Sequence, residues 1–169
     1  MRINLRIKTA IATGIAAASM MAAPAHAESK SSNLAVSATV GANCTISTSA
    51  LDFGTIDTMA ASPVLGTGGV NIACTNGSSW TATANVGGGS GATFASRRMS
   101  AGTNTLNYSL YTDAARTTVW GDGTNSTGVI TNTGTGTAQN ITIYGRIPGS
   151  QTGVPAGDYK DTVSVTVTY

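Results

Sequence analysis

The sequence predicts an all-β protein folded as an antiparallel β-sandwich. Three observations indicate this fold class. Apolar and polar residues alternate with a period of two in several segments. The chain is rich in Thr and Val, whose branched side chains fit a pleated sheet. Gly-rich turns separate the alternating segments, and no segment beyond the first 27 residues has a helical period. Several short strands joined by turns are typical of a sandwich.

In each expected strand, the apolar side chains share one face. In chain order these faces comprise Val70, Ile72 and Cys74; Trp80, Ala82, Ala84 and Val86; Leu106, Tyr108 and Leu110; Ile141, Ile143 and Ile147; and, over residues 159–169, Tyr159, Val163, Val165, Val167 and Tyr169. Gly145 has the parity of its three Ile neighbours, which predicts a bulge or a close approach there. The expected turns are 87–89, 121–123 and 134–136.

The first 27 residues have the features of a secretory signal peptide. Arg2, Arg6 and Lys8 precede an uncharged apolar run over residues 9–23, and Ala25-His26-Ala27 has the small residues of a cleavage site. The apolar run is shorter than the roughly 20 residues of a membrane span. We therefore expect cleavage after Ala27 and export through the periplasm to the cell surface, with no membrane-spanning segment.

Removal of the signal peptide changes the charge of the chain. The full sequence has 9 Lys and Arg against 7 acidic residues. The signal segment contains three of the basic residues and none of the acids, so 6 basic residues remain against 7 acids, a net charge of −1. Among the basic residues that remain, only Arg97 and Arg98 are adjacent. Because nucleic-acid binding needs a clustered basic face, we expect no nucleic-acid partner.

The remaining 142 of 169 residues fit one domain, expected over residues 43–169 after an extension at 28–42. In this extension the apolar residues Leu34, Val36, Ala38 and Val40 alternate with small or polar ones. Only residues 41–43 separate this segment from Cys44. The pattern fits a strand donated to the open sheet edge of another chain. It fits equally well the first strand of a closed domain, and the residues alone leave both interpretations open.

The two cysteines, Cys44 and Cys74, predict one structural disulfide. Both lie beyond the signal segment, and in an oxidising compartment two cysteines form a disulfide by default. A metal site is not expected, because no His follows residue 26 and two Cys are too few ligands. A thiol redox site would have more closely spaced cysteines.

The chain resembles the spore coat protein U domain family, which includes the major subunit of archaic, Csu-type chaperone–usher pili. The resemblance runs from about Leu34 to Tyr169. The segments that carry it are Asn43-Cys44-Thr45-Ile46, Leu51-Asp52-Phe53-Gly54, Val70 to Cys74, Tyr108 to Thr117, and Ala156 to Val163.

This resemblance implies an incomplete immunoglobulin-like sandwich that lacks its last strand. A donor strand from another subunit would complete it, with Leu34, Val36, Ala38 and Val40 as the inserting side chains. The terminal strand would line the acceptor groove through Val163, Val165 and Val167. Cys44–Cys74 would be the family's disulfide.

The implied function is that of a pilin in a surface fibre for adhesion and biofilm formation. The implied partners are copies of itself in a head-to-tail polymer, a periplasmic chaperone, an outer-membrane usher and a tip adhesin. Two alternatives are a secreted coat or matrix protein of the same fold, and a sugar-binding tip adhesin.

We expect no enzymatic activity and no cofactor. The only His, His26, lies in the signal segment, so no His-based triad is available. Most of the acids lie beside Gly or in expected turns, where Asp caps backbone amides. Sugar binding would depend on Trp80 and Trp120, although Trp80 has the parity of a core residue. The basic side chains Arg97, Arg98 and Arg116 are expected on the surface or paired with Asp113.

Overall fold

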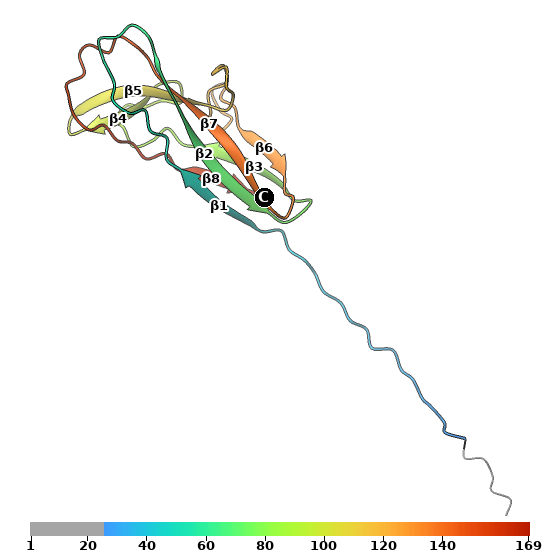
Figure 1. Ribbon diagram of the computed structural model, residues 1–169. Coiled ribbons are helices and arrows are strands. Elements are labelled where there is room, and N and C mark those ends of the chain that lie inside the picture. Colours follow the sequence, from blue (N-terminus) through green and yellow to red (C-terminus); the bar gives the residue numbers. More distant parts are fainter. Residues whose placement is uncertain (1–25) are drawn as a thin grey trace, which may run out of the picture. The chain divides into compact units, whose positions relative to one another are not determined.

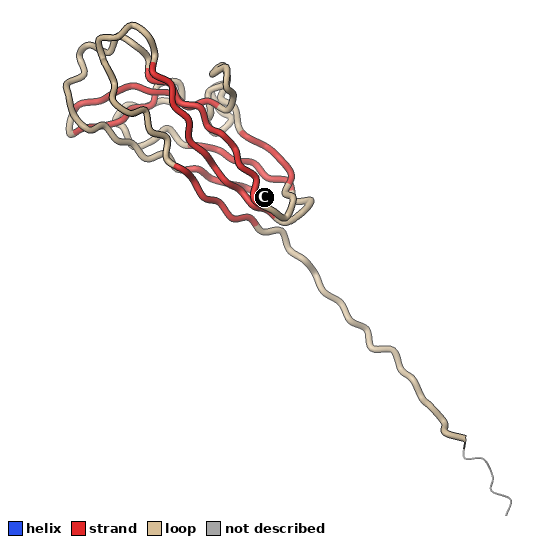
Figure 2. Tube along the Cα trace, viewed as in Figure 1, coloured by secondary structure: helices blue, strands red, loops and turns tan. Residues whose placement is uncertain are grey.

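The computed structural model describes residues 26–169. The predicted signal peptide lies outside the described residues except for His26 and Ala27. The chain divides into two compact units, the second being Thr39–Tyr169. In the first unit, residues 26–38 form neither helix nor strand (Figure 2). Their side chains are exposed. The boundaries expected from the sequence, 1–27, 28–42 and 43–169, remain proposals.

The second unit contains eight antiparallel strands in two sheets (Figure 1). The strands are β1 (Cys44–Ser49), β2 (Val64–Cys74), β3 (Ser79–Ala84), β4 (Arg97–Ala101), β5 (Asn104–Tyr111), β6 (Ile130–Thr133), β7 (Ala138–Ile147) and β8 (Val165–Thr168). One sheet has the order β1-β2-β7-β5-β4, and the other has the order β6-β3-β8. The prediction of an all-β antiparallel sandwich is confirmed. Residues 26–169 contain no helix long and apolar enough to cross a membrane.

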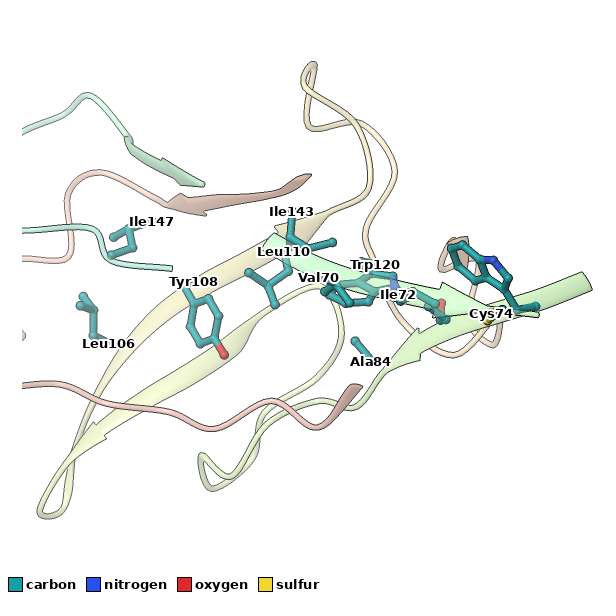
Figure 3. Packing of buried hydrophobic residues seen from close by; sticks show 12 residues of the cluster. Val70, Ile72, Cys74, Ala84, Leu106, Tyr108, Leu110, Trp120, Ile143 and Ile147 are labelled. Atoms are coloured by element: carbon teal, nitrogen blue, oxygen red, sulfur yellow. The ribbon is translucent and has the colours of Figure 1, made fainter. Parts of the chain in front are cut away.

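The core lies between the inner faces of the two sheets. It contains most of the side chains predicted from the alternation, and Figure 3 shows many of them. Tyr169 is instead 55% exposed, and Trp120 is buried although no alternating segment predicted it. The fully buried members are Val70, Ile72, Cys74, Trp80, Ala82, Ala84, Leu106, Tyr108, Leu110, Trp120, Ile143 and Ile147. Because β2 and β7 pair over ten residues, their buried residues form the continuous centre of the larger sheet. The period-two pattern therefore predicted most of the core.

Gly145 in β7 marks a close approach, as predicted. A Cβ atom there would lie 2.6 Å from Phe53 Cζ and 2.9 Å from Leu51 Cδ1. Such distances are shorter than a carbon–carbon contact allows, so only glycine lets residues 51–53 pack onto this part of the sheet. The chain that follows β1 is thereby held against the inner face of β7.

The prediction of one long terminal strand over residues 159–169 is wrong in its extent. Inward and outward side chains do alternate from Tyr159 to Val167, but the paired strand β8 is only Val165–Thr168. β8 pairs with β3, which ends at Ala84. Before β8, Lys160 instead forms an isolated bridge with Ser100 of the other sheet. This segment thus passes from one sheet to the other, and its middle has no ladder partner.

The predicted disulfide between Cys44 and Cys74 is present. The two residues are also partners in the β1–β2 register, so the bond joins the first edge strand to its neighbour. We expect the Cys44→Ser/Cys74→Ser double variant to lose about 3–4 kcal/mol of unfolding free energy, since the bond closes a 30-residue separation. Urea unfolding would measure this loss. Reducing agent should destabilise the wild type and leave the double variant unchanged, and a loss below about 1 kcal/mol would contradict the expectation.

Candidate functional site: a groove between two sheet edges

An open groove of about 500 Å³ lies between the edge of one sheet and the edge of the other. One wall is formed by residues 48–53, which comprise the end of β1 and the segment after it. We call it the N-terminal wall. The opposite wall is formed by residues 159–163 with Val165, and we call it the C-terminal wall. The floor is largely apolar and consists of Val70, Met99, Tyr108, Leu110, Trp120 and Ile143.

Both walls have a free backbone edge. β1 and β8 are the outermost strands of their sheets. In the C-terminal wall, Lys160 and Ser164 are bonded to neighbouring segments through their backbones. Within the described residues, the amide and carbonyl groups of Asp161 and Val163 have no hydrogen-bond partner. Alternate residues of a strand bond to the same neighbour, so this is the edge that one further strand would occupy.

Side chains replace the missing ladder along the C-terminal wall. The Asp161 carboxylate accepts hydrogen bonds from the Tyr108 hydroxyl at 2.5 Å and from the Gly88 amide at 2.7 Å. Asn85 Oδ1 accepts from the Ser164 amide at 2.9 Å, and Asn85 N donates to Ser164 O at 3.1 Å. Two polar side chains therefore hold the wall between the bridge at Lys160 and the start of β8.

Tyr108 connects the floor to both walls. Its ring packs edge-on against Phe53 of the N-terminal wall, with 6.4 Å between the ring centroids. Its hydroxyl binds Asp161 of the C-terminal wall. Burial, together with the hydrogen bond and the charge of Asp161, raises the pKa of Tyr108 well above its usual range. Tyr108 therefore stays protonated and donates to Asp161 throughout the physiological range.

The structure places two of the three predicted groove residues in the groove. Val163 and Val165 line it. Val167 packs against the core but does not belong to the lining. The sequence did not identify the second border, which is β1 with residues 50–53. The only signal for it was the apolar pair Leu51 and Phe53, which has the period of a strand but lies in an irregular segment.

The predicted inserting side chains are fully available to solvent. Leu34, Val36 and Val40 are 87%, 85% and 85% exposed, and Ala38 is exposed as well. Residues 33–40 form no strand in the unpartnered chain, because no described segment pairs with them. The interpretation as the first strand of a closed domain therefore does not describe this structure. Exposed large apolar side chains at alternate positions indicate a surface that becomes covered on association.

Neither tryptophan is available for stacking on a sugar. Trp80 is buried as expected, and its Nε1 donates to Gln139 Oε1 at 3.3 Å. Trp120 is only 1% exposed, and its Nε1 donates to the Ala82 carbonyl at 3.3 Å. A sugar-binding function carried by these two side chains is therefore wrong.

The expected surface position is also wrong for Arg97, which is 0% exposed. Its guanidinium donates to the carbonyl oxygens of Asn85, Phe94 and Trp120 at 2.7–3.1 Å. Desolvation by burial lowers the pKa of Arg97, and the negative charge of Asp161 acts against that shift. Arg116 donates to Gly145 O and lies over the Tyr144 ring rather than pairing with Asp113.

Several aspartates cap turns, as the sequence predicted. Asp52 accepts from the Gly54 amide, Asp122 from the Thr124 amide, and Asp113 from the amides of Thr117 and Thr118. These hydrogen bonds lower the pKa of Asp113 and of Asp122. Low pKa values suit acceptors in turns and not a general acid, which needs a raised pKa.

Comparisons with known proteins agree with this geometry. The profile of the spore coat protein U domain matches residues 30–166. Protein U of Myxococcus xanthus is 39% identical over 179 residues, which cover 96% of this chain and 98% of that protein. A solved structure, the CsuC–CsuE chaperone–tip adhesion subunit pre-assembly complex from archaic chaperone–usher Csu pili of Acinetobacter baumannii, is similar with a TM-score of 0.55 and 25% identity.

That likeness covers 78% of this chain, which spans only 40% of the matched chain in the complex. It supports a fold of the kind found in chaperone–usher pilus subunits, as the sequence suggested. The profile match and the identity to Protein U both extend over almost the whole domain and include the groove walls. The chain therefore belongs to the spore coat protein U domain family.

Proposed function

We propose that this chain is a structural, non-enzymatic subunit that assembles head to tail by strand insertion. Residues 34–40 of one copy enter the groove of another, between its N-terminal and C-terminal walls. The observation that carries the proposal is the apolar groove of about 500 Å³, bordered by free strand edges, on a chain that also exposes an alternating apolar segment. Donor and groove are different surfaces, so the contact propagates into a filament.

The size and chemistry of the two parts match. The C-terminal wall runs from residue 159 to residue 165, seven residues, and the segment 34–40 is also seven residues long. Inserted side chains at alternate positions would meet Val70, Leu110, Trp120, Ile143, Val163 and Val165. Burial of apolar surface supplies about 25 cal/mol per Å², and the ladder adds hydrogen bonds along both walls.

The proposal extends to the partners and the destination of the chain. The similar complex pairs a chaperone with a pilus subunit, which supports a periplasmic chaperone that covers this groove before assembly. An outer-membrane usher and a tip adhesin complete the proposed pathway. The product is a surface fibre for adhesion and biofilm formation, and the Cys44–Cys74 disulfide suits export through an oxidising compartment.

A second candidate function is a secreted coat or matrix protein. It is favoured by the 39% identity to Protein U over 98% of that protein and by the family's description as a spore coat domain. A coat protein of this fold would be extracted as a monomer, whereas a strand-inserted polymer resists SDS until it is heated.

Deletion of residues 32–40 tests the proposal. We expect the exported wild-type chain to form a ladder of SDS-resistant species in unheated samples that collapses to monomer on boiling. The deletion should abolish the ladder and leave monomer in a complex with the chaperone. A ladder that survives the deletion would refute strand insertion by this segment. A wild-type chain that runs as a monomer in unheated SDS samples would favour the coat-protein function.

A further inference from the structure

We propose that Tyr108 and Asp161 are positioning residues that set the width of the groove and hold its C-terminal wall ready for an incoming strand. This inference rests on the proposed function, because it assigns a role in strand uptake. Neither residue is required to contact the donor segment through its side chain. The two residues act on the wall that the segment binds.

Without Asp161, the C-terminal wall would have few interactions to keep its backbone extended. Between Lys160 and Ser164 the chain has no ladder on either side, because β3 ends at Ala84 and the partner at Lys160 belongs to β4. An extended segment without ladder bonds loses its shape readily, since each ordered backbone residue costs about 1–2 kcal/mol of conformational entropy. Some other interaction must therefore keep these residues extended.

The Asp161 carboxylate supplies that interaction. One oxygen accepts from the Tyr108 hydroxyl, and the other accepts from the amides of Gly88 and Thr162, each at 2.7 Å. A Cβ atom at Gly87 would overlap with the carboxylate, so the 87–88 turn closes around Asp161. Charge-assisted hydrogen bonds of this kind are stronger than neutral ones. The contacts hold Asp161 in place while its backbone N–H and C=O remain without a partner at the free edge.

Tyr108 also determines the width of the groove. The Tyr108 ring touches Phe53 of the opposite wall, while its hydroxyl holds Asp161. One side chain therefore spans the floor from wall to wall. Arg97 is buried, and its guanidinium interacts electrostatically with the Asp161 carboxylate. The separation of the walls at this end is thus fixed before a strand arrives, which reduces the ordering required on binding.

Two conservative variants of the full chain test the inference. Tyr108→Phe keeps the ring against Phe53 and removes the hydroxyl. Asp161→Asn keeps the shape but replaces one acceptor oxygen by a donor. Each should weaken uptake of a labelled synthetic peptide of residues 30–42 by about ten- to hundredfold, the range for loss of one hydrogen bond to a charged group. The SDS-resistant polymer should also dissociate at a lower temperature.

The matched control is Ser109→Ala. Ser109 is the neighbour of Tyr108 in β5 and is buried. Its Oγ donates a hydrogen bond of 2.6 Å to Ala95 O, which is not part of the groove. This variant should lose a buried hydrogen bond and yet take up the peptide within about twofold of the wild type. Hydrogen exchange should be faster at the amides of residues 160–164 in Tyr108→Phe and Asp161→Asn, but not in Ser109→Ala.

The double variant Tyr108→Phe/Asp161→Asn completes a cycle. If the two residues act through one contact, the double variant should take up the peptide no less tightly than the single variant with the lower affinity. Peptide uptake by either single variant equal to that of Ser109→Ala would overturn the inference. If the wild type itself took up no peptide and formed no polymer, the proposed function would fail instead, so the two failures are distinguishable.

Discussion

Replacement of Arg97 by methionine is expected to lower the free energy of unfolding by about 3–5 kcal/mol, because several buried carbonyl oxygens lose their donor and each such loss costs about 1–3 kcal/mol. Methionine has a similar length and keeps apolar contact with Phe94, over whose ring the guanidinium lies at 5.6 Å. It donates no hydrogen bond. Within the described residues, the carbonyl oxygens of Asn85, Phe94 and Trp120 have no other donor, so all three would be left unsatisfied.

Urea unfolding of the exported protein would measure this effect, and Arg146→Met serves as the control. Arg146 lies on the exposed face of β7, where substitutions usually change stability by less than about 0.5 kcal/mol. Arg97→Lys keeps the charge but not the planar fork, so it should fall between the wild type and Arg97→Met. If Arg97→Met were no less stable than Arg146→Met, the buried guanidinium would have no structural role.

The burial of Arg97 could not be predicted from the sequence. In the sequence, Arg97 and Arg98 form a short basic pair that is indistinguishable from a surface pair. The burial of Arg97 depends on three loops that end near the same point, at residues 85, 94 and 120, and on the carbonyl groups that they direct inward. No periodic pattern encodes such a meeting of loops. The burial of Trp120 likewise involves a distant strand, since its Nε1 donates to the Ala82 carbonyl.

The strands themselves were predictable because each has a buried face with a period of two. β2, β3, β5 and β7 are central or long, and their inward residues are those predicted. β1 was missed because it is an edge strand whose side chains are mostly exposed, so it has no apolar face to detect. The terminal strand was predicted too long because alternation records which side chains point inward. It does not record whether the backbone has a ladder partner.

The difference between side-chain alternation and backbone pairing also explains how much of the groove was predictable. The sequence could predict Val163 and Val165 as apolar residues on one face, and the structure adds that this face lines an opening. The opposite wall follows from Gly145, whose missing side chain admits Leu51 and Phe53. A glycine in a strand is visible in the sequence, but the segment that approaches it is not.

Val36→Asp is expected to abolish assembly while leaving the folded domain intact. Val36 is 85% exposed in the unpartnered chain, so the substitution costs little before assembly. In the proposed inserted strand its side chain would face the apolar floor of the groove. A carboxylate buried there without a partner costs several kcal/mol, which corresponds to a loss of at least about a hundredfold in affinity. The SDS-resistant ladder and uptake of the variant 30–42 peptide would measure it.

Ser37→Asp is the matched control, because it introduces the same charge one residue later. Side chains at successive positions of a strand point to opposite faces, so the carboxylate introduced by Ser37→Asp would face solvent while Val36 stays inserted. We expect Ser37→Asp to assemble normally and Val36→Ile to retain uptake. Equal loss in Val36→Asp and Ser37→Asp would mean that a negative charge prevents binding whichever face carries it, so that no single face of the segment is buried. Loss in Ser37→Asp alone would mean that the strand inserts with the opposite face, which a shift of one residue produces. The pair of variants thus tests which face of residues 34–40 enters the groove, in addition to whether the segment enters at all.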